Sequence, residues 1–253
     1  MYMEYPKVSV LVPTYNRPEF LPLIIFNVNN YDYDKKKLTL EILDDGDKPL
    51  FKNEKVLQRA KQIIHPIKLK YTYDNKRHLT IGEKRNKLIK NADNNYFAFQ
   101  DDDDIYFESY LKHSYEILKT NKCGLVGSPE MLFCFPYHDF QISYIKCPSK
   151  RQNHEATMFS TRKYVRSMGW FPKSSQGEGA KLVDFNERNV GRTDIKKVMC
   201  CVCHNNNTCK KDRFLQDKIE GSISEIHKKI LGDIFNLNLK VPPSPIPSVQ
   251  SEC

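Results

Sequence analysis

The chain has 253 residues, of which 40% are hydrophobic and 28% charged, so it has enough apolar material for a globular core. No apolar run approaches the roughly 18–20 residues that cross a bilayer, and the N-terminus lacks the charged-then-apolar pattern of a secretion signal. We therefore expect a cytoplasmic protein with no transmembrane segment. The net charge of +9 favours anionic partners, but no aromatic-basic motif predicts nucleic-acid binding. Eight cysteines are too sparse for a disulfide scaffold and predict free thiols.

Strand-like and helix-like segments alternate through the first half of the chain. Short β-branched or alternating apolar runs predict strands, and apolar residues at helical spacing predict the helices between them. In chain order these are a strand at 8–12, a helix at 21–28, a strand at 38–43, a helix at 53–64, a strand at 67–72, a helix at 80–92 and a strand at 96–99. Pro13 ends the first strand, Pro22 falls in the first helical turn, and Thr80 with Glu83 forms a capping box. This alternation predicts an α/β fold with a largely parallel sheet.

The second half is less regular. Short strand candidates and one amphipathic helix follow residue 120, the strands at 124–127, 131–135, 141–145 and 156–160 and the helix at 223–239. Residues 241–253 begin with closely spaced prolines, which exclude a helix and predict a disordered tail. We expect a single domain over residues 1–240.

Four consecutive aspartates, at 101–104, follow the strand that ends at Phe99. Ligands of open parallel sheets bind beyond the carboxyl ends of the strands, which is where this acidic turn falls. Adjacent carboxylates repel one another unless a cation compensates their charge. Asp101 and Asp103 alternate along the turn and could offer the hard oxygen ligands that suit Mg²⁺ or Mn²⁺. A solvated acidic loop is the alternative.

Four motifs in the same order resemble those of family-2 glycosyltransferases. Residues 7–18 (KVSVLVPTYNRP) are similar to the opening strand and nucleotide loop, 41–47 (EILDDGD) to the second strand, 82–86 (GEKRN) to a helix, and 96–104 (YFAFQDDDD) to the strand and Asp-x-Asp metal motif. The resemblance implies a GT-A fold, which is a Rossmann-like mixed, mostly parallel sheet flanked by helices. It also implies a nucleotide-diphospho-sugar donor, most often a UDP-sugar, and Mn²⁺ or Mg²⁺. Residues 1–110 would form the nucleotide-binding half and 111–240 the acceptor half.

Carried over position by position, the resemblance assigns residues to the donor and the metal. Asp45 would accept from the base with Arg85 beside it, Asp102 would face the ribose, and Asp103 would be the direct metal ligand with Asp101 on the same side. The donor set is Pro13, Thr14, Tyr15, Arg17, Asp45, Arg85, Asp101 and Asp102. Taken singly, each residue could have an ordinary role, in packing, in a turn or on a helix surface.

The catalytic half of the resemblance is less complete. Inverting members place a carboxylate in a Gly-Glu-Asp motif after a Gly-Trp/Phe-Phe segment. Here residues 169–172 (GWFP) are followed by 176–180 (QGEGA), and Gly179 stands where Asp is usual. Glu178 is therefore the expected base, with Asp184 a poorer second candidate. The missing aspartate leaves an alternative, a catalytically silent GT-A domain that binds nucleotide-sugar or glycan without transferring it.

A dense run of cysteine, histidine and asparagine spans residues 200–209 (CCVCHNNNTC). Zinc binding is one interpretation, although the run lacks a Cys-x-x-Cys pair. The resemblance instead matches residues 204–208 to a His-x-x-Asn-Thr segment, in which the histidine approaches the metal or the diphosphate. His204 is thus a third candidate metal ligand, and an ordinary structural histidine is the other possibility.

Because phosphate-loop and Gly-x-Gly-x-x-Gly motifs are missing, kinase and dehydrogenase functions have no support. The acceptor stays open.

Overall fold

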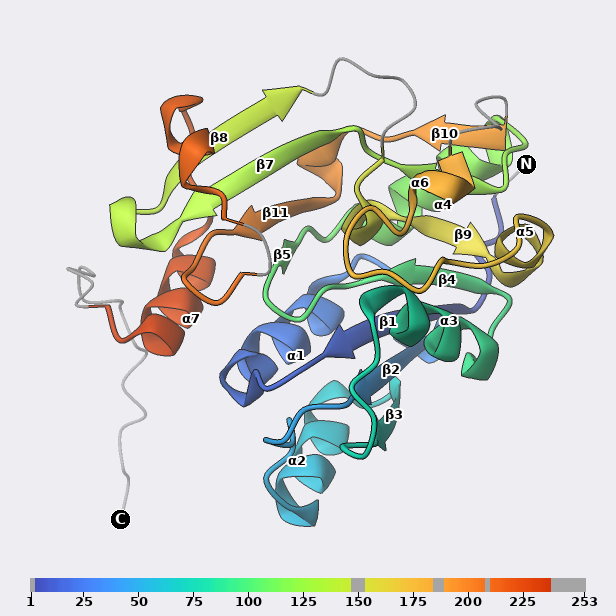
Figure 1. The fold of residues 1–253 in the computed structure, drawn as a ribbon, viewed down its shortest axis with the longest axis horizontal. Helices are drawn as coiled ribbons and strands as arrows, with labels where there is room; N and C mark the ends of the chain where they lie inside the picture. The colour runs from blue at the N-terminus through green and yellow to red at the C-terminus, as the bar shows by residue number, and fades with distance from the viewer. Residues whose placement is uncertain (1–2, 147–152, 184–188, 208–209, 238–253) are drawn as a thin grey trace, which may run out of the picture.

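The computed structural model describes residues 3–146, 153–183, 189–207 and 210–237, and within these ranges the strands form two sheets (Figure 1). The larger sheet has the order β10 (Val190–Arg192), β6 (Leu125–Gly127), β9 (Phe159–Thr161), β4 (Tyr96–Phe99), β1 (Val8–Thr14), β2 (Leu38–Asp44), β3 (Lys68–Tyr73). Neighbouring strands are parallel except at β9, which is antiparallel to both β4 and β6. The predicted mixed, mostly parallel sheet is confirmed.

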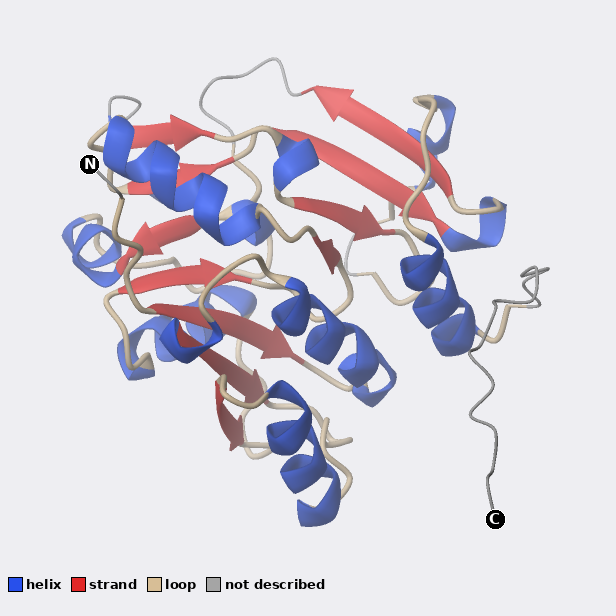
Figure 2. Ribbon diagram, turned by 180° about the vertical axis from the view of Figure 1, so that it is seen from behind, coloured by secondary structure: helices blue, strands red, loops and turns tan. Residues whose placement is uncertain are grey.

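Helices cover both faces of the larger sheet, as the two opposite views show (Figures 1 and 2). One face carries α1 (Leu21–Asn30), α2 (Glu54–Ile64) and α4 (Tyr110–Thr120), and the other carries α3 (Ile81–Asn91), α5 (Arg162–Ser167) and α6 (Ala180–Val183). Alternate side chains of a strand point to opposite faces. Accordingly, Val8, Val10 and Val12 belong to the core beneath α1, α2 and α4, while Leu11 belongs to the core beneath α3.

Local sequence signals set the starts of α2 and α3 but not the end of β1. Thr80 and Glu83 form the predicted capping box, and Asn53 caps α2 by accepting from Val56 N. Pro13 does not end the first strand, however, because β1 continues to Thr14. β4 pairs with β1 only as far as Leu11, so the ladder has already ended on the side where the missing amide of Pro13 would donate.

The smaller sheet, in the order β5 (Ile105–Tyr106), β11 (Met199–Val202), β7 (Glu130–Phe135), β8 (Gln141–Lys146), lies beyond the carboxyl end of β4. Because β5 follows the acidic turn directly, this sheet places β11 beside the turn, and Val202 N donates to Asp104 Oδ1 at 2.9 Å. The helix α7 (Glu225–Phe235) contacts α1 (Figures 1 and 2).

Several elements differ from the predictions. The helices α4, α5 and α6 and the strands β5, β10 and β11 are not among the elements predicted from the sequence. The expected strand at 156–160 is shorter, because a 3-10 turn at Glu155–Thr157 delays β9 to Phe159. The helix predicted at 223–239 is shorter, and the end of that prediction lies outside the described residues, as does the predicted tail at 241–253. No helix in the described ranges is long and apolar enough to cross a membrane.

Candidate functional site

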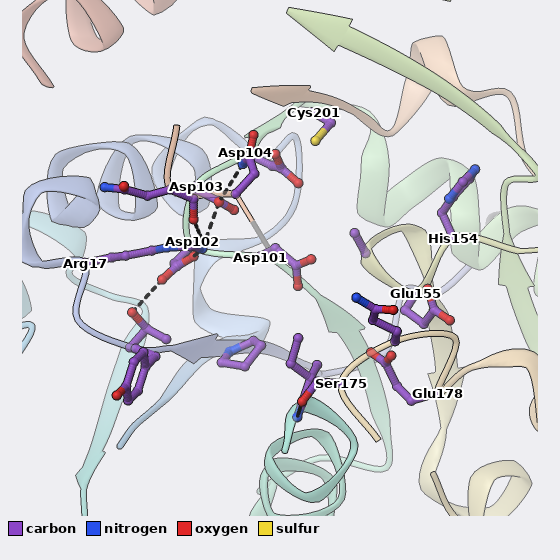
Figure 3. Close-up of a pocket in the computed structure, with 18 of the residues that line it drawn as sticks. Arg17, Asp101, Asp102, Asp103, Asp104, His154, Glu155, Ser175, Glu178 and Cys201 are labelled. Atoms are coloured by element: carbon purple, nitrogen blue, oxygen red, sulfur yellow. Dashed lines mark hydrogen bonds and ion pairs between the residues drawn. The ribbon is translucent and has the colours of Figure 1, made fainter. Parts of the chain in front are cut away.

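A cavity of about 860 Å³ lies at the carboxyl ends of the central strands (Figure 3). Its wall brings together segments that are far apart in the chain, from Pro13 at the end of β1 to Phe214, beyond β11. It includes nearly all of the predicted site residues, namely Pro13, Thr14, Tyr15, Arg17, Asp45, Arg85, Asp101, Asp102, Asp103 and Glu178. His204 lies just behind this wall, in contact with Asp103.

Asp102 is buried and bound from the loop after β1. Thr14 Oγ1 donates to its Oδ2 at 2.6 Å, and Arg17 Nη1 donates to its Oδ1 at 2.9 Å. The same Arg17 nitrogen lies 2.8 Å from Asp103 Oδ2, so one guanidinium holds two consecutive carboxylates. Burial, followed by the charge of Asp103, raises the pKa of Asp102 to about 7. Burial and the neighbouring charge thus disfavour the ionised form of Asp102, and the guanidinium of Arg17 offsets part of this cost.

Asp103 and His204 converge from two different elements. His204 Nε2 lies 3.0 Å from Asp103 Oδ2, and Asn207 Nδ2 donates to the same oxygen at 3.3 Å. Burial opposes ionisation of Asp103, yet the bond from His204 and the charge of Arg17 hold its pKa below the usual value. The His204 ring packs against Phe20 and Phe235, with ring centroids 5.1 and 5.5 Å away, so its orientation is fixed.

These two donors suit a divalent cation of the Mn²⁺ or Mg²⁺ class. A carboxylate oxygen beside an imidazole nitrogen is a mixed donor set that Mn²⁺ accepts, and such ions keep open positions for phosphate oxygens and water. Within the described ranges, no three histidine, cysteine, aspartate or glutamate side chains gather as metal ligands. The protein would therefore supply only part of the coordination shell, and Arg17 would have to share Asp103 with the ion.

The nucleotide side of the cavity is built around Asp45 and Lys84. Lys84, which is only 5% exposed, forms an ion pair with Asp45 and donates to Thr14 O at 3.1 Å. Leu79 N donates to Asp45 Oδ2 at 2.7 Å. Tyr15 is 41% exposed at the rim, with Lys84 Nζ 5.1 Å from its ring centroid. The Asp45 carboxylate and the exposed Tyr15 ring both line the cavity, where they could bind the edge and the face of a nucleobase.

Arg85 links the acidic turn to the predicted base. Its Nη2 lies 3.2 Å from Asp101 Oδ1, its Nε lies 3.1 Å from Glu178 Oε1, and its guanidinium stacks 4.3 Å above the Phe99 ring. Asp101 thus faces Arg85. Its carboxylate feels the charge of Asp103, but among the described residues no hydrogen bond or ion pair joins it to the Asp103–His204 pair. The second candidate base, Asp184, lies outside the described residues.

Sequence reasoning missed four residues of this region: Glu155, Cys201, Asn207 and Lys211. Lys211 lies 2.7 Å from Cys201 Sγ, and the charges of Asp104 and Asp103 help to raise its pKa. Burial, the largest influence, acts in the opposite direction. Only the family resemblance to the His-x-x-Asn-Thr segment could have pointed to Asn207. Cys201 lies in the cysteine-rich run, which points to zinc and not to this cavity, and no local pattern marks Glu155 or Lys211.

The remaining alternatives can also be placed. Cys200, Cys201, Cys203 and His204 form no zinc site among the described residues, which exclude Cys209. The three described cysteines of this run are buried free thiols. Trp170 packs against the core beneath α3, with Lys90 Nζ 4.9 Å from its ring, and does not line the cavity.

Known proteins share this sequence and fold. Over 133 residues the chain is 30% identical to the cellulose synthase catalytic subunit [UDP-forming] of Pseudomonas fluorescens, covering 51% of this chain and 17% of that protein. It is 26% identical to the processive diacylglycerol beta-glycosyltransferase of Mycoplasma genitalium over 146 residues, 54% of this chain and 40% of that protein. The chain therefore spans less than half the length of these curated relatives.

Solved structures show the same fold at low sequence identity. The structure of S. aureus TarS 1–349 in complex with UDP-GlcNAc superposes with a TM-score of 0.58 at 14% identity, covering 91% of this chain and 72% of that one. The mannosyltransferase PcManGT of Pyrobaculum calidifontis, in complex with GDP-Man and Mn²⁺, gives 0.60 at 17% identity, covering 94% and 71%. These similarities confirm the GT-A fold class. A sequence profile described as glycosyl transferase family 2 matches residues 9–173, well over half of the chain, and the protein belongs to this family.

Proposed function

We propose that the chain is a metal-dependent, inverting glycosyltransferase that moves a sugar from a UDP-sugar to an acceptor hydroxyl. The observation that carries this proposal is the gathering of the predicted donor residues around one cavity, with the Asp103–His204 pair at its wall. UDP is favoured over other nucleotides because TarS is solved with UDP-GlcNAc and the cellulose synthase relative is UDP-forming.

The donor would lie across the strand ends with its base toward Asp45. A uracil ring carries an N–H donor that a carboxylate can accept, and the exposed Tyr15 ring offers a surface for stacking. The ribose would lie near Asp102. The diphosphate would then lie between Arg17 and Lys211, two of the cations beside the acidic turn.

Asp103 and His204 would hold the divalent cation. Mn²⁺ or Mg²⁺ bound there would offset the negative charge that builds on the departing nucleoside diphosphate. The two side chains would be preorganised for the ion. Asn207 donates to Asp103, and the aromatic rings packed around His204 fix its orientation.

The acceptor would approach from the opposite wall. Figure 3 shows two carboxylates there, Glu178, which the sequence predicts as the base, and Glu155. One of them would take the proton of the acceptor hydroxyl as its oxygen attacks the anomeric carbon. Attack from the face opposite the leaving diphosphate inverts the configuration in a single displacement.

Release of nucleoside diphosphate from a panel of nucleotide-sugars tests this function. With Mn²⁺ and UDP-GlcNAc or UDP-glucose, we expect UDP release that stops when EDTA removes the metal, and slower or no release from GDP-mannose. The missing aspartate at Gly179 supports a second candidate, a silent domain that binds the donor without reaction. Donor binding with no release from any donor, across a panel of sugar acceptors, would favour that candidate.

A further inference from the structure

Gly179 lies directly against the carboxylate of Glu155. Its backbone N donates to Glu155 Oε1 at 2.9 Å. A Cβ atom at position 179 would lie 2.6 Å from Glu155 Cγ and 2.6 Å from Met158 Cε, which is too close for non-bonded carbon atoms. The side chains of Glu155 and Met158 therefore fill the space where a side chain at 179 would begin.

The turn that carries Glu155 is tied to the acidic turn. Asp101 N donates to Tyr106 Oη at 2.8 Å, and Tyr106 Oη donates to Ala156 O at 3.0 Å. Within the turn, Thr157 Oγ1 donates to His154 O at 2.7 Å. These bonds fix Glu155 relative to the donor side of the cavity, which is the preorganisation that a reacting group needs.

The two glutamates of this wall differ in their partners. Glu178 is 5% exposed and its Oε1 bonds to Arg85, a buried guanidinium that has Asp101 as its other ion-pair partner. A proton on Glu178 would remove part of the charge that compensates Arg85, and a buried charge that loses its partner is costly. Glu155 is half-buried and lines the cavity. Its charge acts on Arg85 from a greater distance, and within the described ranges no lysine or arginine lies at ion-pair distance from its carboxylate.

We propose that Glu155 is the catalytic base and that Glu178 is a positioning residue that holds Arg85. The inference rests on the proposed glycosyl transfer. The proton of the acceptor hydroxyl passes to the Glu155 carboxylate while the acceptor oxygen bonds to the anomeric carbon. The bond from that carbon to the diphosphate oxygen breaks, and its electron pair leaves on the nucleoside diphosphate.

The kinetic test compares Glu155→Gln with Glu178→Gln, using UDP-GlcNAc, Mn²⁺ and water as acceptor. For Glu155→Gln we expect kcat to fall at least ~100-fold, within the usual range for a general base, while KM for the donor changes little. For Glu178→Gln we expect the larger effect to be a rise in KM for the donor, because Arg85 loses its ion pair with the Glu178 carboxylate. Glu54→Gln, on the exposed surface of α2, is the matched control. A kcat within a few-fold of wild type for Glu155→Gln overturns the assignment, as does a kcat-only loss in Glu178→Gln.

The melting temperature tests the geometry without any turnover. Gly179→Ala should lower Tm by roughly 3–10 °C through overpacking, and a smaller loss should remain in a Glu155→Ala background, where only the contact with Met158 Cε is left. An equal loss in both backgrounds overturns the spatial pairing. If the wild-type protein releases no nucleotide from any donor, the proposed function fails, while the pairing of Gly179 with Glu155 is still decided by these melting temperatures.

Discussion

Arg17 Nη1 lies 2.8 Å from Asp103 Oδ2, the same oxygen atom that His204 Nε2 contacts. The guanidinium therefore occupies one side of the place where a divalent cation would bind. Arg17 also holds Asp102, so the acidic turn in this structure depends on a cation that the chain itself supplies.

Replacing Arg17 should make the fold depend on metal. In Arg17→Met the carboxylates of Asp102 and Asp103 lose their counter-charge, and we expect a loss of about 3 kcal/mol in the free energy of unfolding, as for other broken buried pairs. Mn²⁺ should restore part of this loss, and should raise the Tm of the variant more than that of the wild type. Thermal unfolding with and without Mn²⁺ measures both effects. An equal Mn²⁺ shift in the two proteins would contradict this account of Arg17.

Asp45 should select the nucleobase. Its buried carboxylate can accept the N3–H of uracil, whereas N3 of cytosine is itself an acceptor and would face the same oxygen unfavourably. UDP should therefore bind at least ~10-fold more tightly than CDP, which corresponds to about 1.4 kcal/mol. In Asp45→Asn that ratio should shrink toward one. Competition of UDP and CDP for the site measures it, and a ratio unchanged by the substitution would place the base elsewhere.

His227 should make stability fall in mild acid. It is 6% exposed, its ring lies against Phe26, and burial lowers its pKa. Below its unfolded pKa near 6.5, the unfolded chain takes up a proton that the folded chain refuses, so the free energy of unfolding decreases as the pH falls through that value. Urea unfolding at pH 7.5 and 5.5 should show a smaller decrease for His227→Leu than for the wild type. His154, whose pKa burial also lowers, should retain part of the effect in the variant.

The first half of the fold could be predicted because its signals are local. The strand at Tyr96–Phe99 is a continuous apolar run, and the capping box at Thr80 marks the start of α3. By contrast, the short strands β10 and β11 are held by partners far along the chain. β10 pairs with β6 at Leu125–Gly127, and β11 pairs with β5 and β7. The helix α4 does carry a helical pattern of buried residues, so its sequence contains a local signal for a helix.

The candidate site divides in the same way. The acidic turn and Asp45 follow strands directly, so their positions at the sheet edge follow from the sequence. Lys84 looks like a surface charge in the helical pattern, yet it is buried because Asp45, in the turn after β2, compensates its charge. The role inferred for Glu155 depends on its contact with Gly179, 24 residues away, and no local pattern encodes that contact.

Calorimetric titration of UDP with and without Mn²⁺ tests the central claim most directly. If Asp103 and His204 hold the ion beside the diphosphate, Mn²⁺ should tighten UDP binding by at least ~10-fold, or about 1.4 kcal/mol. This gain should be lost in Asp103→Asn but kept in Asp93→Asn, a surface carboxylate that pairs with Lys68 and Lys70. UDP binding that ignores Mn²⁺, or an Asp103→Asn variant that keeps the full gain, would contradict the account.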